Sequence, residues 1–184
     1  MNNDTFYEIL EQVEHRSYLK SEDIPSIDLY MDQIMTLFDI HLENNKRFEN
    51  DKLLTKTMIN NYSIEGILKP IKGKKYSKEH ILQMLCIYSL KNTISIQEIK
   101  KVLQPYHEST DKIEPIYNQF LELNKYLSHE LTNAIQSFVE QKQYDLNDQD
   151  QITIMLLLIC ALSDQFKSIA EKMLDTFYPE PKEK

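Results

Sequence analysis

The second half of the chain repeats apolar residues at heptad spacing over two long segments. From 113 to 138 the repeated positions step alternately by four and three residues, and Asn124 is their one polar member. A second series of the same kind runs from 152 to 173. This spacing is typical of helices that pack along one another. Because only the short loop 143–148 separates the segments, they are predicted to form an antiparallel helical hairpin.

Residues 152–162 are apolar on almost every side of the second expected helix. A helix of this kind is normally buried on more than one side, and one partner helix cannot cover it. The remaining surface must therefore pack on the first half of the chain, on a second chain, or on both. We expect residues 110–178 to form the interface of a homodimer, in which Asn124 would help to fix the register of the helices. The apolar stretch is shorter than the roughly 20 residues that cross a bilayer, so no membrane partner is expected.

The composition of the chain favours an all-α protein. Only 2 of its 184 residues are glycine and 6 are proline, whereas β architectures need many turn residues. Cys86 and Cys160 each lie in an apolar run, which predicts buried free thiols in a reducing compartment. The N-terminal residues have no basic start followed by an apolar run, so we expect no secretory signal and a cytoplasmic location.

The first half of the chain shows the apolar spacing of several shorter helices. Ser26, Thr55 and Ser77 stand where N-terminal caps are expected. Ser95 and Glu98 have the spacing of a capping box, in which each side chain binds a backbone N–H of the other residue. The expected helices comprise residues 4–15, 27–42, 55–64, 77–91 and 95–103.

The most pronounced charge feature is the stretch 52–78, which contains seven lysines and one acidic residue, Glu65. Its formal charge is +7 − 1 = +6; because the whole chain carries −8, the remaining residues sum to −14. A basic patch on an otherwise acidic chain is typical of a protein that binds nucleic acid. The same pattern also fits a solvated lysine loop that binds nothing.

Several motifs in this region occur in the order found in a known family. The segments LTKTMINNY (54–62) and EGILKP (65–70) resemble the recognition helix of MerR-type regulators and the exit from that helix. GKKYS (73–77) is similar to the family's wing and to the entry into its next helix. IYSL (87–90) and SIQEIKKVL (95–103) resemble the helix pair that follows.

The resemblance covers about residues 27–103 and extends to a bacterial family of uncharacterised proteins that share this MerR-like segment. Asn60 stands where MerR-type regulators have an arginine, and Asn61 where they have a tyrosine. The resemblance implies an all-α fold in which a MerR-like winged helix-turn-helix with a small wing lies within a domain of residues 1–106. A long helical hairpin in residues 107–184 would follow.

For function, the resemblance implies a DNA-binding transcriptional regulator that reads DNA with helix 55–64 and a lysine-rich wing at 69–78. An alternative of a different class is a protein–protein interaction module that keeps the helix-turn-helix only as a packing scaffold. The residues expected to contact DNA are Thr55, Lys56, Asn60, Asn61, Tyr62, Lys69, Lys72, Lys74, Lys75 and Tyr76.

Other kinds of site find little support in the sequence. The five histidines are scattered, and none has a cysteine or a second histidine at the spacing of zinc ligands. The chain has no glycine-rich phosphate loop and no serine in a nucleophile elbow. We therefore expect no metal site, no cofactor and no enzymatic activity.

Overall fold

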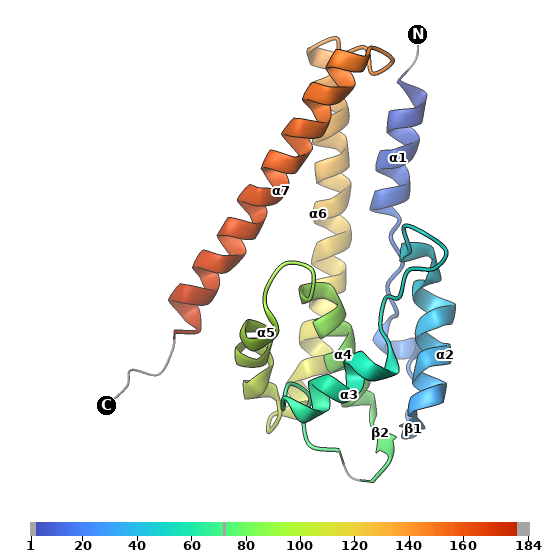
Figure 1. Ribbon diagram of the computed structural model, residues 1–184, viewed down its shortest axis with the longest axis vertical. Helices are drawn as coiled ribbons and strands as arrows, with labels where there is room; N and C mark the ends of the chain where they lie inside the picture. The colour runs from blue at the N-terminus through green and yellow to red at the C-terminus, as the bar shows by residue number, and fades with distance from the viewer. Residues whose placement is uncertain (1–2, 72, 180–184) are drawn as a thin grey trace. The chain divides into compact units, whose positions relative to one another are not determined.

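The computed structural model describes residues 3–71 and 73–179. In these residues the chain is mostly helical, as expected, with seven α-helices and one two-stranded sheet (Figure 1). The helices are α1 Asp4–Glu14, α2 Met31–Leu42, α3 Lys56–Ile64, α4 Lys78–Leu90, α5 Ile96–Leu103, α6 Ile113–Gln141 and α7 Gln149–Phe177. The strands are β1 Leu29–Tyr30 and β2 Lys75–Tyr76.

The chain divides into two compact units, and neither is a single stretch of sequence. The hairpin unit comprises Met1–Arg16 and Glu122–Ile169, and the core unit comprises Ser17–Leu121 and Ala170–Lys184. The division expected between residues 106 and 107 does not coincide with these units. Helix α1 groups with the hairpin instead, and the first turns of α6 group with the core unit.

Helix α4 is the centre of the core unit, because it is buried on nearly all sides. Helices α2, α3 and α5 and the start of α6 contribute apolar residues to the same core. The hydroxyl of Tyr117, at the start of α6, donates a hydrogen bond of 2.9 Å to the backbone oxygen of Leu19. The buried residues of α4 are His80, Ile81, Leu82, Gln83, Met84, Leu85, Ile87 and Tyr88.

Several helix starts follow from local capping, as predicted. The Thr55 hydroxyl accepts a hydrogen bond of 3.1 Å from the N–H of Met58 at the start of α3. At the start of α5, the Ser95 N–H donates to the Glu98 carboxylate at 2.6 Å, and the Glu98 N–H donates to the Ser95 hydroxyl at 3.3 Å. These bonds satisfy backbone N–H groups that have no partner within the helix.

The expected start of the second helix at Ser26 is wrong, because α2 begins at Met31. Leu29 and Tyr30 are extended instead, since β1 pairs antiparallel with β2 and places Leu29 opposite Tyr76. The Gln33 side chain accepts a hydrogen bond of 2.9 Å from the Tyr30 N–H and so caps the start of α2.

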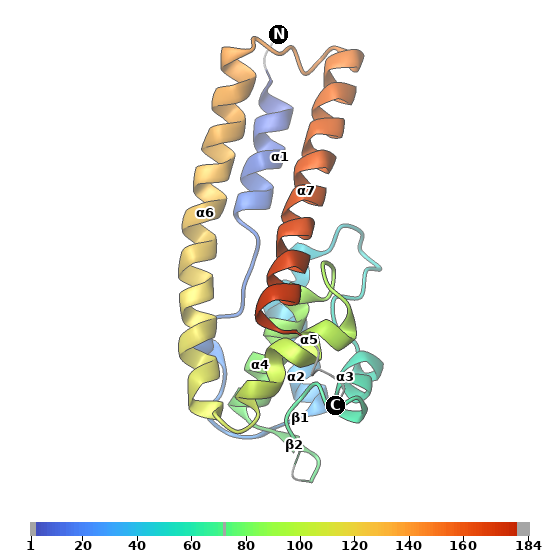
Figure 2. The same ribbon diagram turned by 90° about the vertical axis from the view of Figure 1, so that its left-hand side faces the viewer.

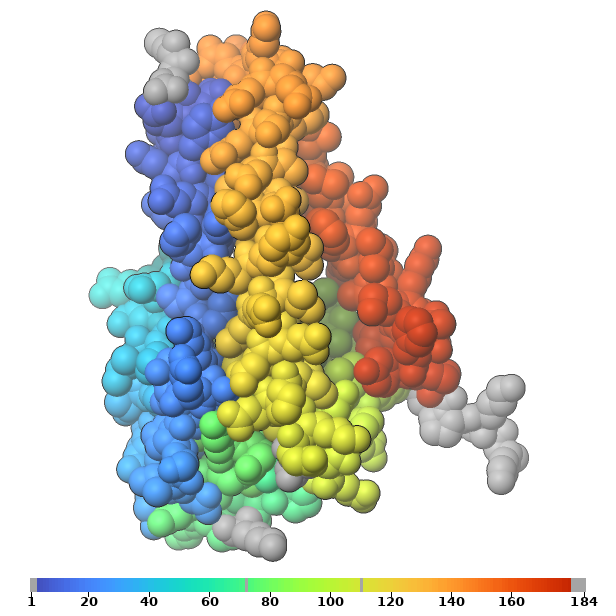
Figure 3. All heavy atoms as spheres, turned by 180° about the vertical axis from the view of Figure 1, so that it is seen from behind, coloured from blue at the N-terminus to red at the C-terminus, as the bar shows by residue number. Residues whose placement is uncertain are grey.

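In the hairpin unit, α1 lies along α6 (Figures 1 and 2), and Figure 3 shows the same contact from behind. The ring of His129 on α6 is 2.9 Å from the carboxylate of Glu14 on α1. The Asn3 side chain donates to the backbone oxygen of Tyr144 at 2.8 Å and accepts from the Leu146 N–H at 2.9 Å. These bonds attach the start of α1 to the loop between α6 and α7.

The two long helices are present as predicted, but within the hairpin unit their heptad positions do not pack against each other. Helix α7 diverges from α6 with distance from the loop (Figure 1). Leu127 and Leu131 on α6 are exposed, and so are Leu162 and Phe166 on α7. Cys160 is exposed as well, contrary to the expectation of two buried thiols.

Helix α7 is the one helix in the described part of the chain that is long and apolar enough to cross a membrane, judged by length and composition alone. Only 6% of its apolar window is buried. Core helices of soluble proteins meet the same criterion, although they are mostly buried. Phe166 and Ile169 are exposed as well, so the apolar surface of α7 extends beyond residues 152–162.

Candidate nucleic-acid interface

Helix α3 ends in a glycine cap that directs the following chain into the core. Gly66 has a φ of +65°, a conformation that costs L-residues with a Cβ atom free energy. The Ile67 N–H donates to the Tyr62 oxygen at 2.8 Å, and the Gly66 N–H donates to the Ser63 oxygen at 3.2 Å. This is the Schellman arrangement, and it leads directly into the buried residues Ile67 and Leu68.

The two faces of α3 have different environments. Ile59 and Tyr62 are buried, which fixes the inner face of the helix against the core. Lys56, Asn60 and Asn61 are exposed on the other side, as helical periodicity predicts. The Tyr62 side chain is only 6% exposed, so the expectation that it contacts DNA does not fit its position.

Two of the lysines predicted to contact DNA, Lys56 and Lys75, each contact a residue at the start of α2. The ammonium group of Lys56 forms an ion pair with Asp32, in the first turn of α2. The ammonium group of Lys75, on β2, lies 4.9 Å from the ring centroid of Tyr30, two residues before Asp32. We call these four residues the α2 corner. Tyr30 and Asp32 are not among the residues predicted from the sequence to contact DNA.

Tyr76 and Thr55, which were also predicted to contact DNA, have side chains that stabilise the fold instead. Tyr76 is 6% exposed, and burial raises the pKa of its hydroxyl. Its side chain is therefore part of the core rather than of a binding surface. The Thr55 hydroxyl is already engaged in the cap of α3.

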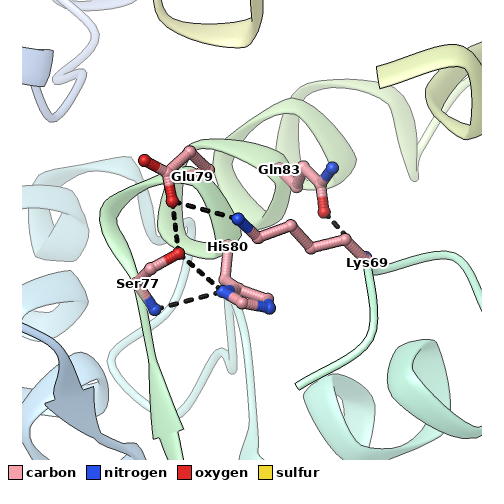
Figure 4. A network of polar contacts seen from close by, with 5 residues as sticks. All are labelled: Lys69, Ser77, Glu79, His80 and Gln83. Carbon is pink, nitrogen blue, oxygen red and sulfur yellow. Dashed lines mark hydrogen bonds and ion pairs between the residues drawn. The ribbon is translucent and has the colours of Figure 1, made fainter. Parts of the chain in front are cut away.

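Lys69, another predicted DNA contact, is turned inward into a polar network at the start of α4 (Figure 4). Its ammonium group is 3.0 Å from the Glu79 carboxylate, and its backbone N–H donates to the Gln83 side chain at 3.0 Å. The Ser77 hydroxyl donates to Glu79 and lies 2.8 Å from Nδ1 of His80. With a side chain that is 15% exposed, Lys69 stabilises the loop and is not available to a phosphate.

The network holds Glu79 charged and His80 neutral. Burial by itself would raise the pKa of Glu79, but hydrogen bonds from Ser77 and Lys69 outweigh it and lower the pKa to about 2. Burial and the charge of Lys69 lower the pKa of His80. Among the described residues, Nε2 of His80 and Nε2 of Gln83 are buried without a hydrogen-bond partner. A neutral imidazole is the form that burial favours.

The remaining lysines of the predicted wing differ in availability. Lys78 is paired with Glu114 at 2.7 Å, whereas Lys74 is exposed beside Gly73, whose φ is +77°. Lys72 lies outside the described residues. Of the ten predicted contacts, the structure therefore leaves five exposed in the described part of the chain: Lys56, Asn60, Asn61, Lys74 and Lys75.

Comparison with known families gives one match. A family described as Domain of unknown function (DUF1836) matches residues 19–120, which is nearly the whole continuous part of the core unit, Ser17–Leu121. Neither the comparison with curated proteins nor that with solved structures gave a match. Because the matched region is more than half of the chain and contains α2 to α5, the protein belongs to the DUF1836 family.

Proposed function

We propose that the protein is a DNA-binding transcriptional regulator in which α3 lies in the major groove and the loop before β2 contacts the DNA backbone. One observation carries this proposal. The exposed face of α3 presents Lys56, Asn60 and Asn61, and Lys75 lies at the same α2 corner as Lys56.

The asparagine and lysine side chains at this surface suit different roles in DNA binding. An asparagine amide both donates and accepts hydrogen bonds, so it matches the major-groove edge of adenine. A lysine ammonium group neutralises phosphates and adds affinity for any sequence. Asn60 and Asn61 would therefore contribute sequence preference, whereas Lys74 and Lys75 would contribute affinity.

The order of elements is similar to that of a MerR-type winged helix-turn-helix. Helix α2, a connection and helix α3 are followed by strand β2 at the entry to α4, and β2 pairs with β1, which precedes α2. In our proposal β1 and β2 form the base of the wing, and Lys74 lies next to the strand Lys75–Tyr76. Since Lys69 and Lys78 are paired with acids, the wing contacts few phosphates.

An electrophoretic mobility shift assay with DNA from upstream of the protein's own gene, at low and moderate salt, tests the proposal. Replacing Lys74 and Lys75 by alanine together should weaken binding to all sequences and reduce the slope of log K against log salt by about two. Replacing Lys112 and Lys142, which are also exposed, removes the same charge elsewhere and serves as the control. An unchanged slope in the first variant would exclude the wing from the interface.

The second candidate is a protein–protein interaction module. Two observations favour it: asparagine replaces the arginine of MerR-type regulators at position 60, and the connection between α2 and α3 spans residues 43–55, longer than the turn of a typical helix-turn-helix. If the unaltered protein shifts no DNA at either salt concentration, this function replaces the first.

A further inference from the structure

The hairpin unit buries few of its own apolar side chains. Among its described residues, Val139 and Met155 are the only buried ones. Burial of apolar surface is the main favourable contribution to folding, so three helices with this little core need another surface to cover them. The heptad positions left exposed are Leu127, Leu131 and Phe138 on α6 and Ile152, Leu162, Phe166 and Ile169 on α7.

The exposed apolar surface of α6 and α7 is as large as one partner's share of a protein–protein interface. Leu156 and Leu158 extend the apolar stripe of α7. Together with the exposed heptad residues they present on the order of 800 Å² of apolar side chain, at roughly 180 Å² for a fully exposed one. The largest apolar patch of a typical monomer is about 300–600 Å². Each partner in a stable complex contributes about 800 Å².

We infer that a second copy of this chain covers the hairpin, so that α6 and α7 of two protomers form an intermolecular four-helix bundle. Both helices carry the heptad spacing that suits helix partners, and a two-fold axis along the bundle can place α6 of one protomer beside α6 of the other. The inference rests on the hairpin unit alone and does not depend on DNA binding.

The interface is narrower than the 110–178 region expected from sequence. The heptad series of α6 begins with Ile113 and Tyr117, but both are buried in the core unit and cannot meet another chain. The series becomes exposed beyond Leu121. The proposed interface therefore comprises residues 123–138 of α6 and 152–169 of α7.

Charged residues beside the stripe argue against lipid as the occupant. Glu122, Lys125 and Glu130 lie on α6 among its apolar positions, and Asp164 and Lys167 lie among those of residues 152–169 of α7. Ionised groups are expensive in the hydrocarbon region of a bilayer. In a helical bundle they lie on the solvent side instead.

Asn124 fits a symmetric interface between two copies. It occupies a heptad position and is half-buried at the edge of the exposed stripe. An amide has both donors and an acceptor, so two copies of one asparagine can hydrogen-bond across a two-fold axis. A polar residue at such a position is known to select register and oligomer state.

Light scattering on the full chain at micromolar concentration tests the inference. The expected mass is twice the chain mass of 21.9 kDa. Leu127→Asp and Phe166→Asp should each weaken self-association by about two orders of magnitude, because each leaves an unpaired charge in the interface. Both side chains are more than half exposed in the single chain, so the helical circular dichroism signal should persist.

Matched controls distinguish the proposed partner from other occupants. Ile40→Asp changes an apolar residue on α2 that is more exposed than Leu127 or Phe166, and it should leave the mass doubled. Asn124→Cys in a Cys160→Ser background should give a disulfide-linked dimer on mild oxidation. A monomeric unaltered chain, a doubled mass that survives both Asp substitutions, or co-flotation of the chain with phosphatidylcholine–phosphatidylglycerol vesicles would each overturn the inference.

Discussion

The backbone conformation at Gly66, just after α3, restricts which residues are tolerated at this position. At a φ of +65°, the Cβ of an L-residue meets the following carbonyl, which costs roughly 1–2 kcal/mol. Gly66→Ala should therefore lower the free energy of unfolding by about 1 kcal/mol in urea titrations. Asparagine tolerates this conformation better, so Gly66→Asn should lose less. Equal stabilities of the alanine variant and the unaltered protein would show that the cap is not strained.

Glu79 makes the stability of the core unit depend on pH. Its pKa is lowered from 4.5 to about 2, so in this range the unfolded chain binds more protons than the folded one. Stability therefore falls as the pH decreases from about 4.5 towards 2. Glu79→Gln should flatten this fall in thermal melts measured across the pH range. Glu22→Gln, at an exposed carboxylate paired with Lys20, serves as the control.

At the scale of the element, α3 combines a buried face and an exposed face, and substitutions should separate their effects. Asn60→Ala should reduce the preference for one base pair by about 1–3 kcal/mol if its amide contacts a base, without changing the melting temperature. Tyr62→Ala should instead destabilise the fold by about 3–5 kcal/mol, as removal of a large buried aromatic side chain does. DNA-binding selections and thermal melts on both variants measure these effects. If Asn60→Ala leaves the base-pair preference unchanged, the role of α3 is structural only.

The loop that follows α3 shows why a charge count overstates a binding surface. The sequence places a formal charge of +6 in residues 52–78, but Lys56, Lys69 and Lys78 are each paired with a carboxylate from another element. A lysine paired in this way releases fewer counterions when DNA binds. The described lysines that remain exposed in the wing are Lys74 and Lys75.

At the scale of the whole molecule, dimerisation through the hairpin unit should affect DNA binding. Two-fold symmetric regulators bind two half-sites about one helical turn of DNA apart. If the chain is such a regulator, Leu127→Asp should lower its affinity for a two-half-site operator by about tenfold or more, because linked binding is lost. Its affinity for a single half-site should not change. Titration of both DNA fragments by fluorescence anisotropy measures the difference, and equal losses on both fragments would contradict it.

Helix starts that depend on neighbouring residues were predictable from the sequence. Thr55 caps α3 and Ser95 caps α5 through hydrogen bonds to residues three positions away. Their geometry is local, so residue identity and spacing are sufficient. The same holds for the exposed side of α3, because the helical period that places Ile59 inward places Lys56 and Asn60 outward.

Parts of the candidate site could not be predicted because they depend on distant partners. By its sequence position Lys69 is a wing lysine. In the fold its ammonium group pairs with Glu79 and its backbone N–H bonds to Gln83. Tyr62 matches the motif of a DNA-contacting helix, yet its ring is buried in the core. A side chain's direction is decided by the free energy of its final surroundings, which the local sequence does not contain.

The sequence alone determined that this chain is mostly helical and which two segments, on either side of the loop 143–148, form its long helices, because helical spacing acts within a few residues. Only the tertiary structure decided that Leu29 and Tyr30 pair with β2 rather than begin a helix. It also decided that Leu127 and Phe166 remain exposed. Both outcomes depend on segments far apart in the sequence, and the heptad pattern specifies that a helix needs an apolar partner but not which chain supplies it.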